Sequence, residues 1–267
     1  MTAYTYPFLD FPERKSKPRT CGRTMVHDGG ISPGHFELIL ETAAPYIDYY
    51  KFQSTHRLIP EAITLKKIEM CRQNNINLYM GGNITELAWI QGHWNDMMAY
   101  IKKHSWIAVE ISATYVPFTI EQRIELIKEV SGEGFEVFYE WGSKHPTEPL
   151  NPDEAASGIR QFIAAGASVV VIEEGEIDML IGKDGKGEYA DRLTKLFNDI
   201  GIERLMIESG ESKQMAWLLT HYGTDINIGN IHYDEVVDLE SLRCGIGRSV
   251  DNFIYKPYLE KLNAGNG

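Results

Sequence analysis

Short apolar runs, rich in β-branched and aromatic residues, alternate with segments of helical periodicity along almost the whole chain. Eight of these runs have the length and composition of buried strands. They cover residues 23–28, 47–52, 76–80, 106–112, 135–140, 168–173, 204–208 and 225–228. We expect each strand to end within about four residues of the end of its run, the usual error of such boundaries.

The segments between the runs carry helix signals. Residues 60–72 place apolar side chains on one face and charged side chains on the other. Thr119 stands three residues before Gln122, which is the spacing of a capping box. Asn151 precedes Pro152 as an N-cap residue precedes a proline in the first helical position. These signals predict a helix after most of the strands.

Strands that alternate with helices predict a parallel sheet with right-handed crossovers. Eight such units of about 30 residues fill the roughly 250 residues of a typical (β/α)₈ barrel. An open doubly wound sheet is the alternative, and periodicity does not exclude it. We favour a single (β/α)₈ TIM barrel, because the count is eight and no linker-like break divides the chain. The expected domains are an N-terminal extension (1–20), the barrel catalytic domain (21–250) and a C-terminal tail (251–267).

Composition and charge narrow the class of protein. Lys and Arg number 26 against 38 Asp and Glu, so the net charge is −12, which argues against general nucleic-acid binding. No apolar run approaches the roughly 20 residues that span a bilayer, and residues 1–20 lack the apolar core of a signal peptide. The three cysteines are widely spaced and fit neither a disulfide framework nor a paired zinc site. We therefore expect a cytoplasmic globular protein.

Carboxylates gather where the predicted strands end, and chemistry in parallel α/β folds takes place at that edge. The five residues are Asp28, Glu110, Glu140, Glu173 and Glu208. A single glutamate of this kind is more often a salt-bridge partner, but five on one rim predict a polar active site. Converging carboxylates are costly unless a hard cation such as Mg²⁺ offsets their repulsion. Which of the five would contact such a cation stays open at this point.

Two lysines accompany these carboxylates. Lys51 lies near the end of the second run, and Lys144 follows the fifth. They would supply positive charge for an anionic substrate, or a proton-transfer group with a lowered pKa. Gly81 and Gly82 follow the third run, where glycine lets the backbone approach a ligand, although ordinary turn chemistry explains them equally well.

Several segments together resemble the phosphosulfolactate synthase family in order and spacing. They are residues 50–52, 79–82, 109–112, 140–144, 171–173, 207–208 and 226–243. The most specific is 230–243, where the family has Asn-Ile-x-x-Asp-Glu-Val-x-x-Leu-Glu-x-Leu-Arg. The resemblance extends over residues 22–247, nearly the whole chain.

The resemblance implies a barrel enzyme that adds sulfite to phosphoenolpyruvate with Mg²⁺ as cofactor. Lys144 matches a family lysine proposed to deliver a proton to an enolate-like carbon, and Lys51 matches the lysine that ends the second strand, which is expected to contact an anion. The metal site would be drawn from the four glutamates named above. Substrate-binding positions are expected at Asp28, Gly81, Gly82, Asn227 and Asn230.

The chain departs from the family pattern at two places that carry cations. Where the family has Asp-Lys-Gly after the first strand, this chain has Asp-Gly-Gly at residues 28–30. Where the family has Glu-Gly-Arg-Glu-Ser-Gly, residues 173–178 are Glu-Glu-Gly-Glu-Ile-Asp. Losing two cations from a site for a dianion is expected to cost several kcal/mol of binding. Candidate replacements near strand ends are His56, Arg57, His145, Lys213 and His232.

The leading hypothesis is a Mg²⁺-dependent, carbon–sulfur bond-forming lyase that adds sulfite to phosphoenolpyruvate or a related unsaturated or enol acid. A second hypothesis is a family-derived enzyme acting on a non-phosphorylated carbonyl or enolate substrate. A third is a non-catalytic, stress-related barrel protein, because plant heat-stress-associated proteins resemble this family too. The expected partner is a small anionic substrate, without nucleic acid or membrane, and assembly into a homo-oligomer stays open.

Overall fold

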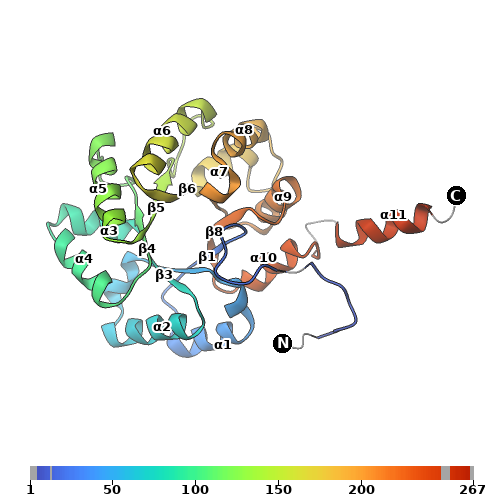
Figure 1. Cartoon of the computed structure of the whole chain (residues 1–267), viewed down its shortest axis with the longest axis horizontal. Coiled ribbons are helices and arrows are strands. Elements are labelled where there is room, and N and C mark those ends of the chain that lie inside the picture. Colours follow the sequence, from blue (N-terminus) through green and yellow to red (C-terminus); the bar gives the residue numbers. More distant parts are fainter. Residues whose placement is uncertain (1–4, 13, 248–252, 265–267) are drawn as a thin grey trace.

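A computed structural model describes residues 5–12, 14–247 and 253–264 of the chain. Eight parallel strands pair in chain order, and β8 pairs with β1, so the sheet closes into a barrel (Figure 1). The strands are β1 (Thr24–His27), β2 (Tyr49–Phe52), β3 (Asn77–Met80), β4 (Ala108–Ile111), β5 (Glu136–Trp141), β6 (Ala167–Ile172), β7 (Leu205–Glu208) and β8 (Asn227–His232). The predicted (β/α)₈ barrel is confirmed, and the open sheet is excluded.

The predicted strand ends agree with the observed ones to within one residue, except at β8. This strand continues to His232, four residues past its predicted end. A β-bulge explains the difference: Thr24 pairs with Ile228 but Val26 pairs with Ile231, and Asn230 takes a positive φ of 61°. The extra residue of the bulge interrupts the apolar pattern, so the pattern ends before the strand does.

Helices surround the barrel in Figure 1. They are α1 (Pro33–Ala43), α2 (Glu61–Gln73), α3 (Gly82–Ile90), α4 (Trp94–Lys103), α5 (Ile120–Gly132), α6 (Pro152–Ala165), α7 (Glu174–Ile181), α8 (Ala190–Ile200), α9 (Ser212–Tyr222), α10 (Val236–Arg243) and α11 (Lys256–Ala264). Both predicted caps are confirmed: Thr119 and Gln122 form a capping box on α5, and Asn151 accepts two backbone N–H groups at the start of α6. Two helices instead of one precede β4 and β7.

The barrel interior is filled mainly by large side chains from alternate strand positions. They are Met25, Tyr49, Tyr79, Ala108, Phe138, Val169, Val171 and Met206. The rings of Tyr79 and Phe138 meet edge to face, 4.8 Å apart. Gly229 leaves space for this packing, because a Cβ there would lie 2.9 Å from atoms of both Met25 and Met206. A second apolar layer lies between the strands and the helices.

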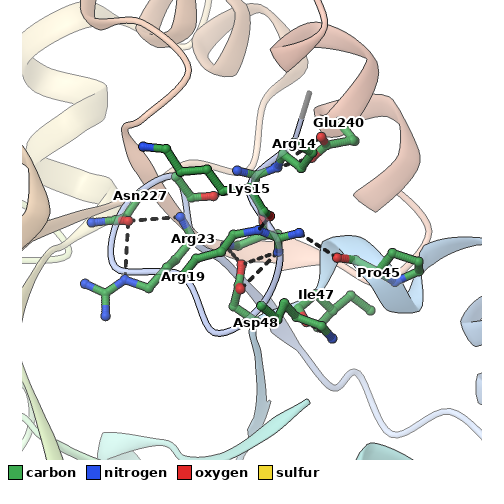
Figure 2. A network of polar contacts seen from close by, with 12 residues as sticks. Arg14, Lys15, Arg19, Arg23, Pro45, Ile47, Asp48, Asn227 and Glu240 are labelled. Carbon is green, nitrogen blue, oxygen red and sulfur yellow. Dashed lines mark hydrogen bonds and ion pairs between the residues drawn. The ribbon is translucent and has the colours of Figure 1, made fainter. Parts of the chain in front are cut away.

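The segment before β1 is bound to the N-terminal face of the barrel, as Figure 2 shows. Arg19 donates to Asp48 at 3.0 Å and to the carbonyl of Pro45 at 2.8 Å. Lys17 donates to three backbone carbonyls where α1, its following turn and α2 end. Arg14 pairs with Glu240 of α10 at 3.0 Å. Part of the predicted extension 1–20 therefore packs against the barrel.

At the other end of the chain, α11 extends away from the ring of helices (Figure 1). The side chains of Tyr258, Leu259 and Leu262 on this helix are exposed. The predicted boundary between barrel and tail, at residues 250 and 251, lies outside the described residues. Among the helices of the described part, none has the length and apolar character needed to cross a membrane.

Candidate active site

Three glutamates from different strands converge at the C-terminal mouth of the barrel. Glu110 lies in β4, Glu140 in β5 and Glu208 at the end of β7, and one carboxylate oxygen of each lies within 4.8 Å of the others. Strand alternation turns them inward, because Phe138 and Met206, two positions earlier in β5 and β7, also fill the interior. The sequence prediction of converging carboxylates is correct for these three.

Glu110 is the most tightly held of the three. Its Oε2 accepts hydrogen bonds from Lys51 Nζ at 2.9 Å and from the Tyr79 hydroxyl at 2.5 Å. Its Oε1 accepts the backbone N–H of Gly82 at 2.6 Å. These partners come from β2, β3 and the start of α3, so one carboxylate ties together three neighbouring units of the barrel.

Lys51 lies among the glutamates. Its side chain is buried, with Nζ 2.9 Å from Glu110 and 3.4 Å from Glu208. Burial lowers the pKa of this lysine, but the surrounding glutamates outweigh it and raise the pKa well above its usual value. Lys51 is therefore a buried cation already paired with two carboxylates. The sequence suggested a contact with an anionic substrate, and these ion pairs point instead to a role in holding the carboxylates together.

Crowding of like charges changes the acidity of the cluster. Burial and neighbouring carboxylates raise the pKa values of Glu140, Glu173 and Glu208 to about 7. For Glu140 the neighbours are Glu110 and Glu208, and for Glu173 the first is Glu140. The cluster therefore binds protons near neutral pH, and it would lose these protons when a cation binds.

Glu173 lies directly after β6 and is 6% exposed. It does not belong to the group of three glutamates whose carboxylate oxygens converge. Its Oε2 is nevertheless buried and has no hydrogen-bond partner among the described residues. An orphaned carboxylate oxygen beside Glu140 and Lys144 is costly unless a ligand satisfies it. Glu173 is therefore available to a substrate or to a water ligand of a cation.

Lys144 lies on the exposed loop between β5 and α6, within the electrostatic reach of Glu173 and Glu140. Its Nζ lies 5.9 Å from the centre of the Tyr115 ring. Burial lowers its pKa, but the two glutamates outweigh that effect and the pKa is raised overall. Lys144 is therefore an ammonium group at neutral pH, and not the lysine of lowered pKa that was one of the two roles expected from the sequence.

Glu86 of α3 organises the neighbouring loop, and the sequence analysis missed it. Its carboxylate accepts the backbone N–H groups of Thr114, Tyr115 and Val116 at 2.6–3.0 Å, and also the Ser112 hydroxyl. The loop in turn donates the Thr114 hydroxyl to Glu140 at 2.7 Å. The only sequence signal was an acidic residue on the buried side of a helix.

A second helix carboxylate holds the loop that carries Lys144. Glu176 of α7 accepts the backbone N–H of Ser143 at 3.0 Å. Next to it, Gly175 lies so close to this loop that a Cβ would stand 2.5 Å from the Lys144 carbonyl oxygen. The departure from the family pattern at Gly175 therefore lets the loop pack against the start of α7.

Asp28, a predicted substrate contact, is fully buried and already bonded on both oxygens. Oδ2 accepts from Lys67 Nζ and lies 2.9 Å from His56 Nε2, while Oδ1 accepts the Gly30 N–H at 2.7 Å. Lys67 is itself fully buried. Because every one of these partners is internal, Asp28 holds the loops after β1 and β2 together. His56, suggested as a replacement cation, is bound in this cluster.

The other predicted substrate contacts lie in three different surroundings. Gly81 and Gly82 are at the mouth, where Gly82 approaches Glu110 and a Cβ on Gly81 would stand 3.2 Å from the Lys51 side chain. Asn230 lies in the bulge of β8. Asn227 lies at the opposite end of the barrel, where its side-chain oxygen accepts the backbone N–H of Arg23 (Figure 2). Its amide nitrogen donates to the carbonyl of Leu205 in β7.

The trio of oxygens fits a hard divalent cation. Mg²⁺ prefers oxygen ligands and commonly takes one or two carboxylates with substrate oxygens or water. Glu140 and Glu208 each keep a carboxylate oxygen without a hydrogen bond to any described residue. Their raised pKa values mark a surplus of negative charge, which a cation would relieve. The residues present therefore suit such an ion.

Comparison with solved structures supports the architecture. The chain superposes on the YdjI aldolase from Escherichia coli K12 with a TM-score of 0.56, covering 91% of each chain at 13% identity. At that identity the likeness concerns the fold alone.

Comparison of sequences identifies the family. The family model described as (2R)-phospho-3-sulfolactate synthase matches residues 12–248. The chain is 30% identical over 240 residues to the phosphosulfolactate synthase of Methanothermobacter thermautotrophicus, covering 88% of this chain and 93% of that one. It is 31% identical over 252 residues to that of Methanocaldococcus jannaschii, covering 92% and 97%. The chain therefore belongs to the phosphosulfolactate synthase family, as a divergent member.

Proposed function

We propose that this protein is a Mg²⁺-dependent lyase that adds sulfite to phosphoenolpyruvate or a related unsaturated acid. The observation that carries the proposal is the oxygen trio of Glu110, Glu140 and Glu208 beside Lys51 and Lys144. The names of its sequence relatives, phosphosulfolactate synthases, point to the same reaction class.

In this proposal Glu110, Glu140 and Glu208 would hold the cation, and Glu173, an electrostatic neighbour of Glu140, would add negative charge beside it. The cation would supply electrostatic stabilisation of the negative charge that builds up on the substrate carboxylate during the addition. Lys51 keeps Glu110 and Glu208 in place and offsets part of their charge before the ion binds. Tyr79 and the N–H of Gly82 fix the orientation of Glu110.

Lys144 would deliver the proton. The sulfur lone pair forms the new carbon–sulfur bond at the terminal alkene carbon, and the π electrons move towards the carboxylate. The ammonium of Lys144 then protonates the adjacent carbon, and the lysine regains a proton from solvent. The ammonium is kept charged by Glu173 and Glu140, and the loop is placed by Glu176 and by the Tyr115 ring.

The test is product formation under anaerobic conditions with Mg²⁺, sulfite and phosphoenolpyruvate. We expect mass spectrometry to detect a sulfonate, and one deuterium on the protonated carbon when the reaction is run in D₂O. Chelation of the metal should abolish the product, and Glu208→Gln should reduce it strongly. The absence of a sulfonate from phosphoenolpyruvate and from every unsaturated acid tried would contradict the proposal and favour a non-catalytic role.

One observation favours a variant of this function with a non-phosphorylated substrate. Gly29 and Gly175 occupy the positions where the resemblance led us to expect a lysine and an arginine. His56, one candidate replacement, is bound to Asp28, and Arg57, His145 and Lys213 are exposed. The remaining candidate, His232, lies at the barrel mouth.

A further inference from the structure

Two imidazoles line the side of the mouth that lies across from Glu140. His27 ends β1 and His232 ends β8, and they are partners in the strand ladder. His27 is also the ladder partner of Lys51, whose side chain points inward to reach Glu110. Paired residues of neighbouring strands point to the same face of the sheet, so both imidazoles face the mouth. Their ring centroids are 5.4 Å apart.

The pair has unused hydrogen-bonding capacity. Within the described part of the chain, neither ring nitrogen of His27 has a hydrogen-bond partner, although the side chain is only partly exposed. His232 uses Nδ1 to bond the carboxylate of Asp234, which leaves Nε2 directed elsewhere. Both rings are partly exposed at the mouth, so these nitrogens are accessible to a bound ligand.

This wall of the mouth nevertheless carries no net positive charge. Burial first, and then Lys51 and His232, lower the pKa of His27 to about 4, so its ring is neutral at neutral pH. His232 is paired with the carboxylate of Asp234. Lys67 is likewise balanced by Asp28.

The opposite wall has no positive charge to spare either. Glu110, Glu140, Glu173 and Glu208 carry four carboxylates, and the lysines at the mouth are Lys51 and Lys144. With a divalent cation bound, the formal charges of these groups sum to zero, so no positive charge remains to pair with a phosphate dianion. Nor does the start of α7 have space for a long cation, because the Lys144 loop lies against Gly175.

We infer that His27 and His232 form a subsite for a second oxygen group of the substrate, and that this group is a carboxylate, carbonyl or hydroxyl rather than a phosphate. The position of the first group, a carboxylate held near the glutamates, rests on the proposed function. β1 lies across the closed barrel from β5, so a small acid bound at Glu140 extends towards the imidazoles. The substrate class is an unsaturated acid with an unphosphorylated oxygen group at its other end.

Calorimetric binding in Mg²⁺ without sulfite tests this subsite, with fumarate and oxaloacetate as unphosphorylated probes and phosphoenolpyruvate as the phosphorylated one. We expect at least one of the two unphosphorylated acids to bind tenfold or more tightly than phosphoenolpyruvate. His27→Leu should weaken that binding about tenfold or more, the usual effect of losing a hydrogen bond to a charged group. His27→Gln, which keeps an N–H donor, should recover part of it, and His232→Ala should lose affinity.

His93→Ala is the matched control, because that histidine is exposed on the outside of the barrel and its loss should leave binding unchanged. Circular dichroism and Mg²⁺ affinity establish that each variant is folded. The inference is overturned if phosphoenolpyruvate binds as tightly as the better unphosphorylated acid, if neither of these acids binds, or if folded His27→Leu keeps wild-type affinity. Binding is measured without turnover. If the protein prefers an unphosphorylated acid to phosphoenolpyruvate but forms no sulfonate, the proposed reaction is refuted and the subsite is still supported.

Discussion

At the scale of single residues, partners determine what each ionisable group at the mouth does. Lys51 and Lys144 are both lysines near glutamates, yet one is buried in two ion pairs and the other lies on an exposed loop. The first has a structural and electrostatic role, because its ammonium is already bound. The second has no hydrogen bond or ion pair with the described residues, so it is free to act on a ligand.

Replacement of Lys144 by alanine should reduce turnover with little change in folding. A group that delivers a proton contributes about 10²–10⁴-fold in rate, so we expect kcat to fall by that factor. Thermal stability and Mg²⁺ affinity should stay near wild type, because the side chain is exposed and supports no packing. Steady-state kinetics would check this against Lys66→Ala, an exposed lysine of α2, which should be silent. Wild-type kcat in Lys144→Ala would rule out the proton-donor role.

The raised pKa of Glu208 predicts how stability depends on pH when no metal is bound. The folded-state pKa is about 7 against an ordinary value of 4.5, so the folded protein binds this proton more tightly. The resulting stabilisation is present below about pH 4.5 and is lost as the pH rises through 7. Glu208→Gln mimics the protonated form, and the pH-dependent loss should shrink by about 1–3 kcal/mol.

Urea unfolding between pH 5 and 8 in a chelator would measure this difference. Glu125→Gln on the exposed face of α5 serves as the control, and its curve should run parallel to that of the wild type. Mg²⁺ should restore wild-type stability most at pH 8, where the carboxylates are ionised. If Glu208→Gln and wild type show the same pH dependence, the glutamates are not crowded as described.

At the scale of elements, the loops after the strands are held from behind by helix carboxylates and by close backbone contacts. Glu86 of α3 fixes the loop after β4, and Glu176 of α7 fixes the loop after β5. Gly82, the first residue of α3, brings its N–H directly onto Glu110. A helix that follows one strand thus positions the loop of a neighbouring strand, which is the next strand for Glu86 and the preceding strand for Glu176.

Replacement of Gly82 by alanine should disturb the metal site through the backbone. An added Cβ would stand 2.3 Å from the Ser112 hydroxyl oxygen and 2.8 Å from Glu110 Oε1, so something must shift. We expect Mg²⁺ affinity to fall at least tenfold and stability to fall by about 1–3 kcal/mol, as for overpacking of a buried site.

Gly132→Ala is the matched control for this substitution. It lies in the last turn of α5 with nothing within 4 Å of the added Cβ. It should be neutral, or stabilising by about 0.5–1 kcal/mol. Calorimetric titration with Mg²⁺ and chemical denaturation give both quantities, and equal behaviour of the two variants would show that the approach of Gly82 to Glu110 is unimportant.

At the scale of the whole molecule, the segment before β1 covers part of the N-terminal face of the barrel. Asp48, between η1 (Ala44–Tyr46) and β2, accepts Arg19 from that segment and the backbone N–H of Thr24 at the start of β1. The Arg19 and Asp48 side chains, whose contact is drawn in Figure 2, are 3% and 4% exposed, so both charges are withdrawn from water. The N-terminal segment is thereby part of the folded barrel.

Arg19→Ala should therefore destabilise the protein by about 3–5 kcal/mol, because it leaves a buried carboxylate without its counter-charge. Lys15→Ala removes an ion pair from the same segment, but its partner Asp225 and the lysine itself are more than half exposed. That pair is worth about 0–1 kcal/mol. Urea denaturation of the two variants compares them directly. A loss below about 1 kcal/mol in Arg19→Ala would show that the segment is not needed for stability.

The sequence alone determined the architecture and the composition of the site. Short β-branched and aromatic runs and helix caps are local signals, so they located eight strands and predicted the closed barrel from their number. They failed at β8, where the bulge at Asn230 breaks the pattern. Strand-end position also identified Glu110, Glu140 and Glu208, because parallel strands bring their C-terminal ends to one edge.

Only the tertiary structure decided which groups are free. Asp28 and Lys51 were expected to contact the substrate, but both form ion pairs with residues far away in the sequence. Asp28 pairs with Lys67, and Lys51 pairs with Glu208. His27 lay in an apolar run and drew no attention, because its pairing with a histidine some 200 residues later exists only once the barrel closes. The residue types at the strand ends can be read locally from the sequence. The protonation, orientation and availability of a side chain depend instead on contacts between residues that are distant in the sequence and meet only in the folded barrel.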